Sequence, residues 1–189
     1  PPYLPLTQDD GTYTIFRSIP NPKAMEDIAD KTKENGYNLN FTAHLKLYKD
    51  ILSVKGVYGM NQESMRRSIF IPSDVYFSRM YKSRGNIQSE RRLTQTLEAM
   101  LTFSKYMFNT VQIDALAGIG KYLESYEGYG ISYEDVHDAI NEHDISSAKG
   151  KFYPTSHTAK NEKRSQFFKA GFDILDKYVI TATLRRDGT

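Results

Sequence analysis

The sequence predicts a mainly α fold: a single helical domain of five to seven helices around a long central helical element, with an extended N-terminal arm and a short C-terminal tail. Two observations predict it. Apolar residues between 89 and 126 recur near the helical period of about 3.6 residues, and capping signals precede several other amphipathic stretches. The predicted divisions are the arm at 1–20, the helical domain at 21–180 and the tail at 181–189.

The first half of the chain is predicted to hold the arm and several helices. Prolines near the N-terminus disfavour helix in the arm, and Asp10 followed by Gly11 signals a turn. Asn21 is placed to cap a helix that has Pro22 in its first turn and ends near Gly36. Further helices are predicted at about 41–54, 61–70 and 73–85.

The second half is predicted to hold the central element and two further helices. The apolar stripe of the central element includes Leu93, Leu97 and Leu101. The pattern is interpreted as one long helix or two in near-continuous succession. Ser132 begins a capping box that would open a short helix. The last helix is predicted at about 159–179.

Composition excludes several classes of site. Because the chain has no cysteine, it has no disulfide, zinc–thiolate site, iron–sulfur cluster or cysteine nucleophile. No apolar run approaches the roughly 20 residues of a membrane-crossing helix, and no secretory signal opens the chain. These features predict a soluble protein without a membrane span. Because the first residue is Pro rather than Met, the sequence is interpreted as a piece of a longer one.

Charge differs between regions although the net charge is only +2. Residues 61–110 contain eight basic and four acidic residues, and residues 149–189 contain nine basic and four acidic ones. Residues 111–148 contain one Lys and eight acids. This distribution predicts one of two arrangements. Either the basic segments form a polyanion-binding surface with an acidic edge that repels the polyanion, or the oppositely charged faces of neighbouring molecules contact each other. The alternative is that the segments neutralise one another inside one fold.

Basic residues at two predicted helix N-termini are the sharpest functional indication. Arg91 and Arg92 fall in the first turn of the central helix, and further cations fall in the first turn of the last helix. Cations there cost roughly 0.3–1 kcal/mol each, because the helix dipole is positive at that end. A bound phosphate would turn this cost into a gain. The alternative is that Glu90 and Glu162 offset the cations and solvent screens the rest.

These features predict a non-enzymatic, self-assembling structural protein that binds single-stranded nucleic acid, RNA or DNA, as a viral nucleocapsid or coat protein does. Cations would hold phosphates and tyrosines would stack bases. Copies would meet through the N-terminal arm and the acidic 124–144 segment, in a virion or the host cytoplasm. The candidate nucleic-acid-binding residues are Arg66, Arg67, Arg79, Lys82, Arg84, Arg91, Arg92, Lys160, Lys163, Arg164, Tyr76 and Tyr81.

Two alternative functions use other features of the same sequence. A helical protein–protein adaptor would bring its basic surface to an acidic partner without nucleic acid. A metal-dependent enzyme would use Glu134 and His137, whose i, i+3 spacing occurs in di-iron carboxylate bundles. Because only one copy of that motif is present, a structural interpretation is preferred. No metal, cofactor or catalytic residue is therefore predicted.

Overall fold

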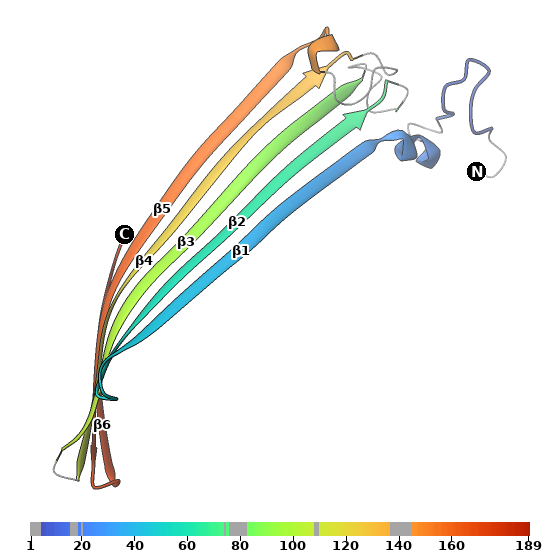
Figure 1. Ribbon diagram of the computed structural model, residues 1–189. Helices are drawn as coiled ribbons and strands as arrows, with labels where there is room; N and C mark the ends of the chain where they lie inside the picture. The colour runs from blue at the N-terminus through green and yellow to red at the C-terminus, as the bar shows by residue number, and fades with distance from the viewer. Residues whose placement is uncertain are drawn as a thin grey trace. The chain divides into compact units, whose positions relative to one another are not determined.

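The chain folds into β-strands, as seen in a computed structural model that describes residues 5–15, 19, 21–73, 75, 83–107, 110–136 and 145–189 (Figure 1). Six strands form one sheet in which each strand neighbours the next along the chain. The strands are β1 (Ala29–Tyr48), β2 (Leu52–Ile71), β3 (Arg84–Met107), β4 (Val111–Glu134), β5 (Phe152–Ile174) and β6 (Tyr178–Gly188). The helical elements among the described residues are two short 3-10 helices, η1 (Pro22–Asp27) and η4 (Ile145–Ser147). In this part of the chain no helix has the length and hydropathy needed to cross a membrane.

The predicted mainly α fold is therefore wrong. Nearly all of the described structure is antiparallel β-sheet, and the predicted central helix lies in strands β3 and β4. Leu93, Leu97 and Leu101 are spaced by four residues, which places side chains on one side of a helix and equally on one face of a strand. The other predicted helices fall on β1 and β2 (41–54), on β2 (61–70) and on β5 and β6 (159–179), whereas 73–85 lies mostly outside the described residues.

Two local signals near the N-terminus are confirmed. Gly11 follows Asp10 in a turn and adopts a φ of +79°, a conformation that glycine accepts without steric cost. Asn21 caps η1, because its side chain accepts a hydrogen bond of 3.0 Å from the Lys23 N–H. This helix ends at Asp27 rather than near residue 36, because β1 begins soon afterwards.

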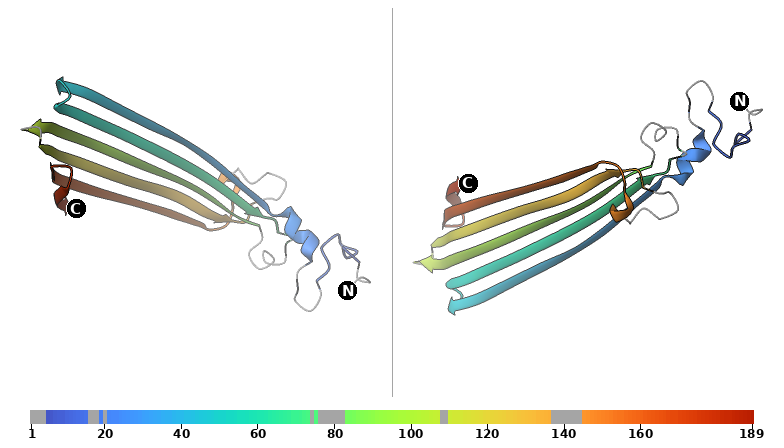
Figure 2. Two further views of the ribbon diagram at one scale, coloured as in Figure 1. Left: turned by 90° about the horizontal axis from the view of Figure 1, so that it is seen from below. Right: turned by 90° about the horizontal axis from the view of Figure 1, so that it is seen from above.

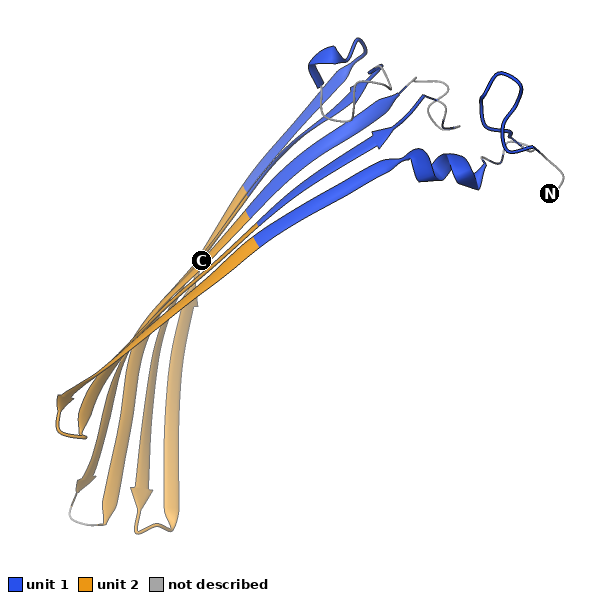
Figure 3. Ribbon diagram, turned by 45° about the vertical axis from the view of Figure 1, so that its right-hand side comes forward, with its two compact units in different colours: residues 1–35, 64–91, 127–158 blue, residues 36–63, 92–126, 159–189 orange. Residues whose placement is uncertain are grey.

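The chain contains two compact units (Figure 3). Unit 1 comprises residues 1–35, 64–91 and 127–158, and unit 2 comprises residues 36–63, 92–126 and 159–189. Strands β1 to β5 each contribute residues to both units. The predicted divisions at residues 20 and 180 stay a prediction, and residues 181–188 of the predicted C-terminal tail belong to β6.

Unit 1 encloses a small hydrophobic core. Its buried members are Phe70, Tyr133 and Val136, with exposed fractions of 5%, 1% and 4%. The Tyr133 ring lies over Gly85, where an added methyl group would be 2.3 Å from the ring. The Ser83 hydroxyl donates a hydrogen bond to the Val136 carbonyl across the same region. The half-buried residues around this core are Ala29, Ile87, Ile145 and Ala148.

Unit 2 contains the tight connections between neighbouring strands. Residues 49–51 join β1 to β2, and residues 175–177 join β5 to β6, so both pairs are hairpins (Figure 2). The β5–β6 register places Phe168 opposite Leu184. Leu175 adopts a φ of +58° in its turn, the left-handed conformation that hairpin connections commonly require. This register fixes which side chains of the two strands share a face.

Candidate functional site

Unit 2 presents two chemically different faces, because successive side chains of a strand point to opposite faces of its sheet. Contacts at glycines show which residues of neighbouring strands share a face. A methyl group at Gly118 of β4 would lie 2.2 Å from the Phe167 ring of β5, and one at Gly120 would lie 2.6 Å from Ser165 Oγ. Even-numbered residues of β4 therefore share a face with odd-numbered residues of β5.

The same relation extends to the other strands. A methyl group at Gly120 would lie 3.7 Å from Glu98 Cγ of β3, and one at Gly59 of β2 would lie 3.8 Å from Thr96 Cβ and 3.2 Å from Asn40 Oδ1. Each β6 residue shares a face with its β5 partner. One face of unit 2, here called the polar face, therefore consists of even-numbered residues of β1, β3 and β4 and odd-numbered residues of β2, β5 and β6. The opposite face is called the apolar face.

The apolar face is exposed and consists mainly of large hydrophobic side chains. Phe41 is 63% exposed, Leu45 62% and Leu184 72%. The exposed hydrophobic members of this face include Tyr37, Leu39, Phe41, Leu45, Leu47, Leu97, Leu101, Ile119, Phe168, Phe172, Tyr178, Ile180 and Leu184. Because soluble monomers rarely expose contiguous apolar patches larger than a few hundred Å², this face requires a covering phase or partner.

The apolar run has a characteristic length. Alternate residues from 37 to 47 of β1 are Tyr, Leu, Phe, Ala, Leu and Leu; those from 111 to 119 of β4 are Val, Ile, Ala, Ala and Ile. These runs of nine and eleven residues span roughly 30–36 Å at about 3.3 Å per residue. A strand tilted by about 45° then covers roughly 21–26 Å along the bilayer normal, close to the ~25 Å apolar band of membrane-crossing strands.

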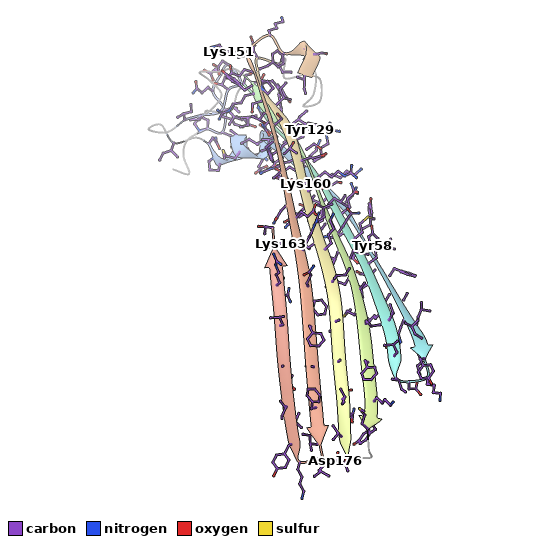
Figure 4. The ribbon with its side chains drawn as sticks, turned by 90° about the vertical axis from the view of Figure 1, so that its left-hand side faces the viewer. Tyr58, Tyr129, Lys151, Lys160, Lys163 and Asp176 are labelled. Atoms are coloured by element: carbon purple, nitrogen blue, oxygen red, sulfur yellow. The ribbon has the colours of Figure 1, made fainter. Side chains whose placement is uncertain are left out.

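The polar face of the same unit carries charges and hydroxyls. Arg92 Nε donates a hydrogen bond of 2.8 Å to Glu124 Oε1 across β3 and β4. Arg185 Nε of β6 donates to the Asp187 carboxylate at 2.9 Å. A hollow at this face is lined mainly by Thr96, Glu98, Gly120, Tyr122, Lys163, Ser165, Arg185 and Asp187, and the adjacent residues Lys121, Arg164, Gly188 and Thr189 complete its lining; Figure 4 labels Lys163 among the side chains of the sheet. These groups suit contact with water and polar solutes.

The predicted nucleic-acid-binding residues lie on strands rather than in the first turns of helices, so the helix-dipole premise fails. In unit 1, Arg67 of β2 donates through Nε to Asp30 Oδ1 at 3.0 Å and through Nη2 to Asp30 Oδ2 at 2.7 Å. These hydrogen bonds lower the pKa of Asp30 below its ordinary value. The other described candidates of unit 1 are Arg66, Arg84 and Arg91, on β2 and β3.

The candidates in unit 2 are divided between its two faces. Arg92 and Lys163 lie on the polar face, whereas Lys160 and Arg164 lie on the apolar face. Arg164 Nε donates to Glu162 Oε1 at 2.8 Å. Arg92, through Glu124, and Arg164 therefore both pair with carboxylates of this chain. The structure therefore does not gather these cations into one phosphate-binding surface.

Some predicted residues lie outside the described residues. They are Arg79, Lys82, Tyr76, Tyr81 and His137, the last belonging to the alternative metal motif. Within the described ranges, no three His, Asp or Glu side chains lie close enough together to hold a metal ion.

Comparisons with known proteins indicate the context of this sheet. No protein-family model matches the chain. The whole chain is 27% identical, over 194 residues, to 19% of the TonB-dependent receptor P3 of Formosa agariphila. In fold, 93% of this chain matches 20% of a chain of the RagAB peptide importer. The TM-score is 0.81 and the sequence identity 16% for the open-open state, and the TM-score is 0.78 and the identity 18% for the closed-closed state. The chain thus spans about one fifth of the length of these proteins.

These comparisons overturn the predicted function, partner and location. The chain resembles a TonB-dependent receptor and a peptide importer rather than a viral nucleocapsid or coat protein. Single-stranded nucleic acid as partner and a soluble state in a virion or the host cytoplasm are accordingly wrong. The helical adaptor fails as well, because the sheet replaces its helices.

The sequence signal that could have found the two faces is alternation. Residues 111, 113, 115, 117 and 119 are all apolar, whereas 112, 114, 118 and 120 are Gln, Asp, Gly and Gly. Such a period of two is the pattern of a strand with one apolar face.

Proposed function

We propose that this chain forms part of the membrane-embedded sheet of a longer outer-membrane receptor that imports peptides. In this role it acts by binding and passage, not by chemical conversion. The observation that carries the proposal is the exposed apolar face of unit 2, set back to back with a polar face on the same strands. The TonB-dependent receptor P3 and the RagAB peptide importer support the class of protein and the substrate.

Lipid is the cover that fits the apolar face. Removing a fully exposed Leu or Phe side chain from water is worth about 1.5–3 kcal/mol, and this face displays many such side chains at more than half exposure, including Phe41, Leu45 and Leu184. Hydrocarbon also requires that backbone N–H and C=O groups be hydrogen-bonded within the protein. Strands β2 to β5 meet this requirement, because each has a neighbour on both sides.

The polar face fits the path of an imported peptide. Arg92, Glu98, Glu124 and Lys163 give it both signs of charge. A peptide likewise carries backbone donors and acceptors and both kinds of charged side chain, so mixed charge allows sequence-tolerant contact rather than attraction of one ion type. We assign this face to the side along which the substrate moves.

Peptide uptake by cells tests this function. Cells lacking the gene should lose uptake of fluorescent peptides, and the full-length gene should restore it. Undiminished uptake without the gene would contradict the import role. The full-length receptor should also stay with outer-membrane fragments during alkaline carbonate extraction; release by this treatment would contradict insertion in lipid.

Two lysines of β5 provide a matched pair for the assignment of the faces. Lys163, an odd-numbered residue, lies on the polar face and Lys160, an even-numbered one, lies on the apolar face; Figure 4 labels both residues. Lys163→Glu should reduce uptake of acidic peptides relative to basic ones, because it reverses a charge on the substrate path. Lys160→Glu should leave this preference unchanged. Equal effects of the two substitutions would show that the faces are assigned wrongly.

A further inference from the structure

Three basic residues on neighbouring strands form a group on the apolar face of unit 2, which also carries Lys105 and Lys160. The three are Lys121 of β4, Arg164 of β5 and Arg186 of β6, which belong to three neighbouring strands. On a lipid-facing surface, Lys or Arg costs about 2–4 kcal/mol at the bilayer midplane and about 0–1 kcal/mol near the interface. These cations therefore mark the level at which the apolar face of β4 to β6 reaches the headgroups.

Contacts and register bring these cations together. Lys121 Nζ lies 3.1 Å from Glu162 Oε1, and Arg164 Nη2 lies 2.8 Å from the same oxygen. Arg186 is directly opposite Gln166 in the β5–β6 register, which makes it a diagonal neighbour of Arg164.

The group has a net positive charge. Three cations face one carboxylate, and Arg186 forms no ion pair with any described residue. Lys160 adds a further positive charge on the same face of β5, two residues before Glu162. Arg185 and Asp187 point to the polar face, so they do not neutralise the group.

A shallow groove runs from this basic group along the apolar face. One depression is lined by residues that include Val54, Ala99, Leu101, Ala117, Phe168 and Arg186. A second depression is lined by residues that include Leu97, Ala99, Lys121 and Arg164. Ala99, Ile119 and Gln166 line both, so the two depressions are continuous. The small side chains of Ala99 and Ala117 leave a track between larger ones, suited to a hydrocarbon chain.

We propose that this surface binds a phosphate-bearing lipid, with its acyl chain over Ala99 and Ala117 and its headgroup phosphate among Lys121, Arg164 and Arg186. The inference rests on the proposed function, because it requires this face to contact lipid. Guanidinium groups bind phosphate through paired hydrogen bonds, and Lys adds a point charge. Glu162 holds Lys121 and Arg164 in place beside it.

Native mass spectrometry of the full-length receptor tests the site. The receptor is taken from nanodiscs of phosphatidylcholine mixed with phosphatidylglycerol, and the retained lipids are counted. A triple variant, Lys121→Gln/Arg164→Gln/Arg186→Gln, should retain at least about tenfold less phosphatidylglycerol, since each basic residue near a membrane surface contributes about 1 kcal/mol.

The control triple variant is Lys163→Gln/Lys169→Gln/Arg185→Gln, which removes the same charge from the polar face of β5 and β6. It should retain phosphatidylglycerol as the unmodified receptor does. Equal loss in both triple variants, or no loss in either, would overturn the proposed site. Comparable insertion of all three proteins into nanodiscs excludes misfolding as the cause.

Two further experiments separate binding of a whole lipid from binding of a phosphate ion alone. Ala117→Phe fills the groove and should reduce lipid retention while leaving all three cations in place. Displacement of the lipid by inorganic phosphate at equal concentration would overturn the acyl-chain contribution and indicate a simple anion site. Failure of the unmodified receptor to enter nanodiscs would contradict the proposed function itself, whereas insertion without preference for phosphatidylglycerol would contradict this inference alone.

Discussion

The two faces of unit 2 are built from the same strands yet differ in almost every physical property. On the apolar face, Phe168 and Leu184 are 46% and 72% exposed and have no protein cover. On the polar face, the neighbouring Phe167 ring lies on Gly118, and charges such as Arg92 have carboxylate partners. Two successive side chains of one strand therefore have different surroundings, because they point to opposite faces. This difference is the one that the proposed function requires, because lipid would cover the apolar face and water the polar face.

The largest expected effect comes from placing a charge on each face at the same level. Leu101→Arg puts a guanidinium on the apolar face and should reduce the stability of the inserted full-length receptor by about 2–4 kcal/mol. Thr102→Arg, its neighbour on the polar face of β3, should cost far less, because water solvates the charge. Urea unfolding in lipid vesicles measures both variants. Similar losses would remove the distinction between the faces.

A smaller effect is expected from closing the gaps under the polar-face rings. Gly118→Ala brings a methyl group to 2.2 Å from the Phe167 ring, so the ring must move, at a cost of about 1–3 kcal/mol. Gly171→Ala is the control, because its nearest neighbours would be 3.9 Å away. The same unfolding assay should separate the two substitutions. A neutral Gly118→Ala would indicate that this ring does not pack on the β4 backbone.

The ion pair on the polar face should contribute less. Arg92 and Glu124 have side-chain exposed fractions of 53% and 23%, and such accessible pairs are usually worth about 0.2–1 kcal/mol. A double-mutant cycle with Arg92→Gln and Glu124→Gln should return a coupling energy in this range. A coupling of several kcal/mol would mean that the polar face is shielded from water, which would contradict its assignment as the water-facing side.

The smallest effect concerns a pair in unit 1, which serves as a water-exposed reference. Hydrogen bonds from Arg67 lower the pKa of Asp30 from its ordinary value of 3.8. Its stabilising contribution is therefore present above that value and is lost as the pH falls through the lowered pKa. Arg67→Gln should return the pKa toward 3.8. Carboxyl-carbon NMR titration measures the change, with Arg66→Gln as the control that should leave it unmoved.

Local signals predicted from the sequence survive where they depend on nearby residues alone. The turn at Asp10 and Gly11 and the cap at Asn21 are of this kind, because backbone conformation and one hydrogen bond decide them. The fold class fails because the four-residue spacing of Leu93, Leu97 and Leu101 satisfies a helix and a strand equally. Alternation across 111–119 distinguishes the two, but Leu116 weakens the pattern by placing an apolar side chain on the polar face.

The helix-terminus premise of the predicted site fails for a related reason. The sequence predicts Arg91 and Arg92 on one surface at a helix N-terminus, whereas adjacent residues of a strand point to opposite faces. The sequence predicts no membrane span because it lacks an apolar run of about 20 residues, the length that a helix needs. A strand needs only nine to eleven alternating positions, and half of these are polar, so no continuous apolar run is present. Pairing between strands, which creates the faces, is not encoded in any single stretch.

The most direct test of the central claim is a spin-label scan along β3 in the full-length receptor reconstituted in lipid vesicles. This segment has no cysteine, so single cysteines placed from 93 to 104 report on it individually. Labels at odd positions such as Leu97 and Leu101 should collide mainly with oxygen, which concentrates in lipid. Those at even positions such as Thr96 and Thr102 should collide mainly with a water-soluble nickel chelate. The predicted result is that the collision rates with oxygen and with the nickel chelate both alternate every two residues, with the maxima of one at the minima of the other. Equal access of the nickel chelate to odd and even positions would contradict a lipid-facing sheet.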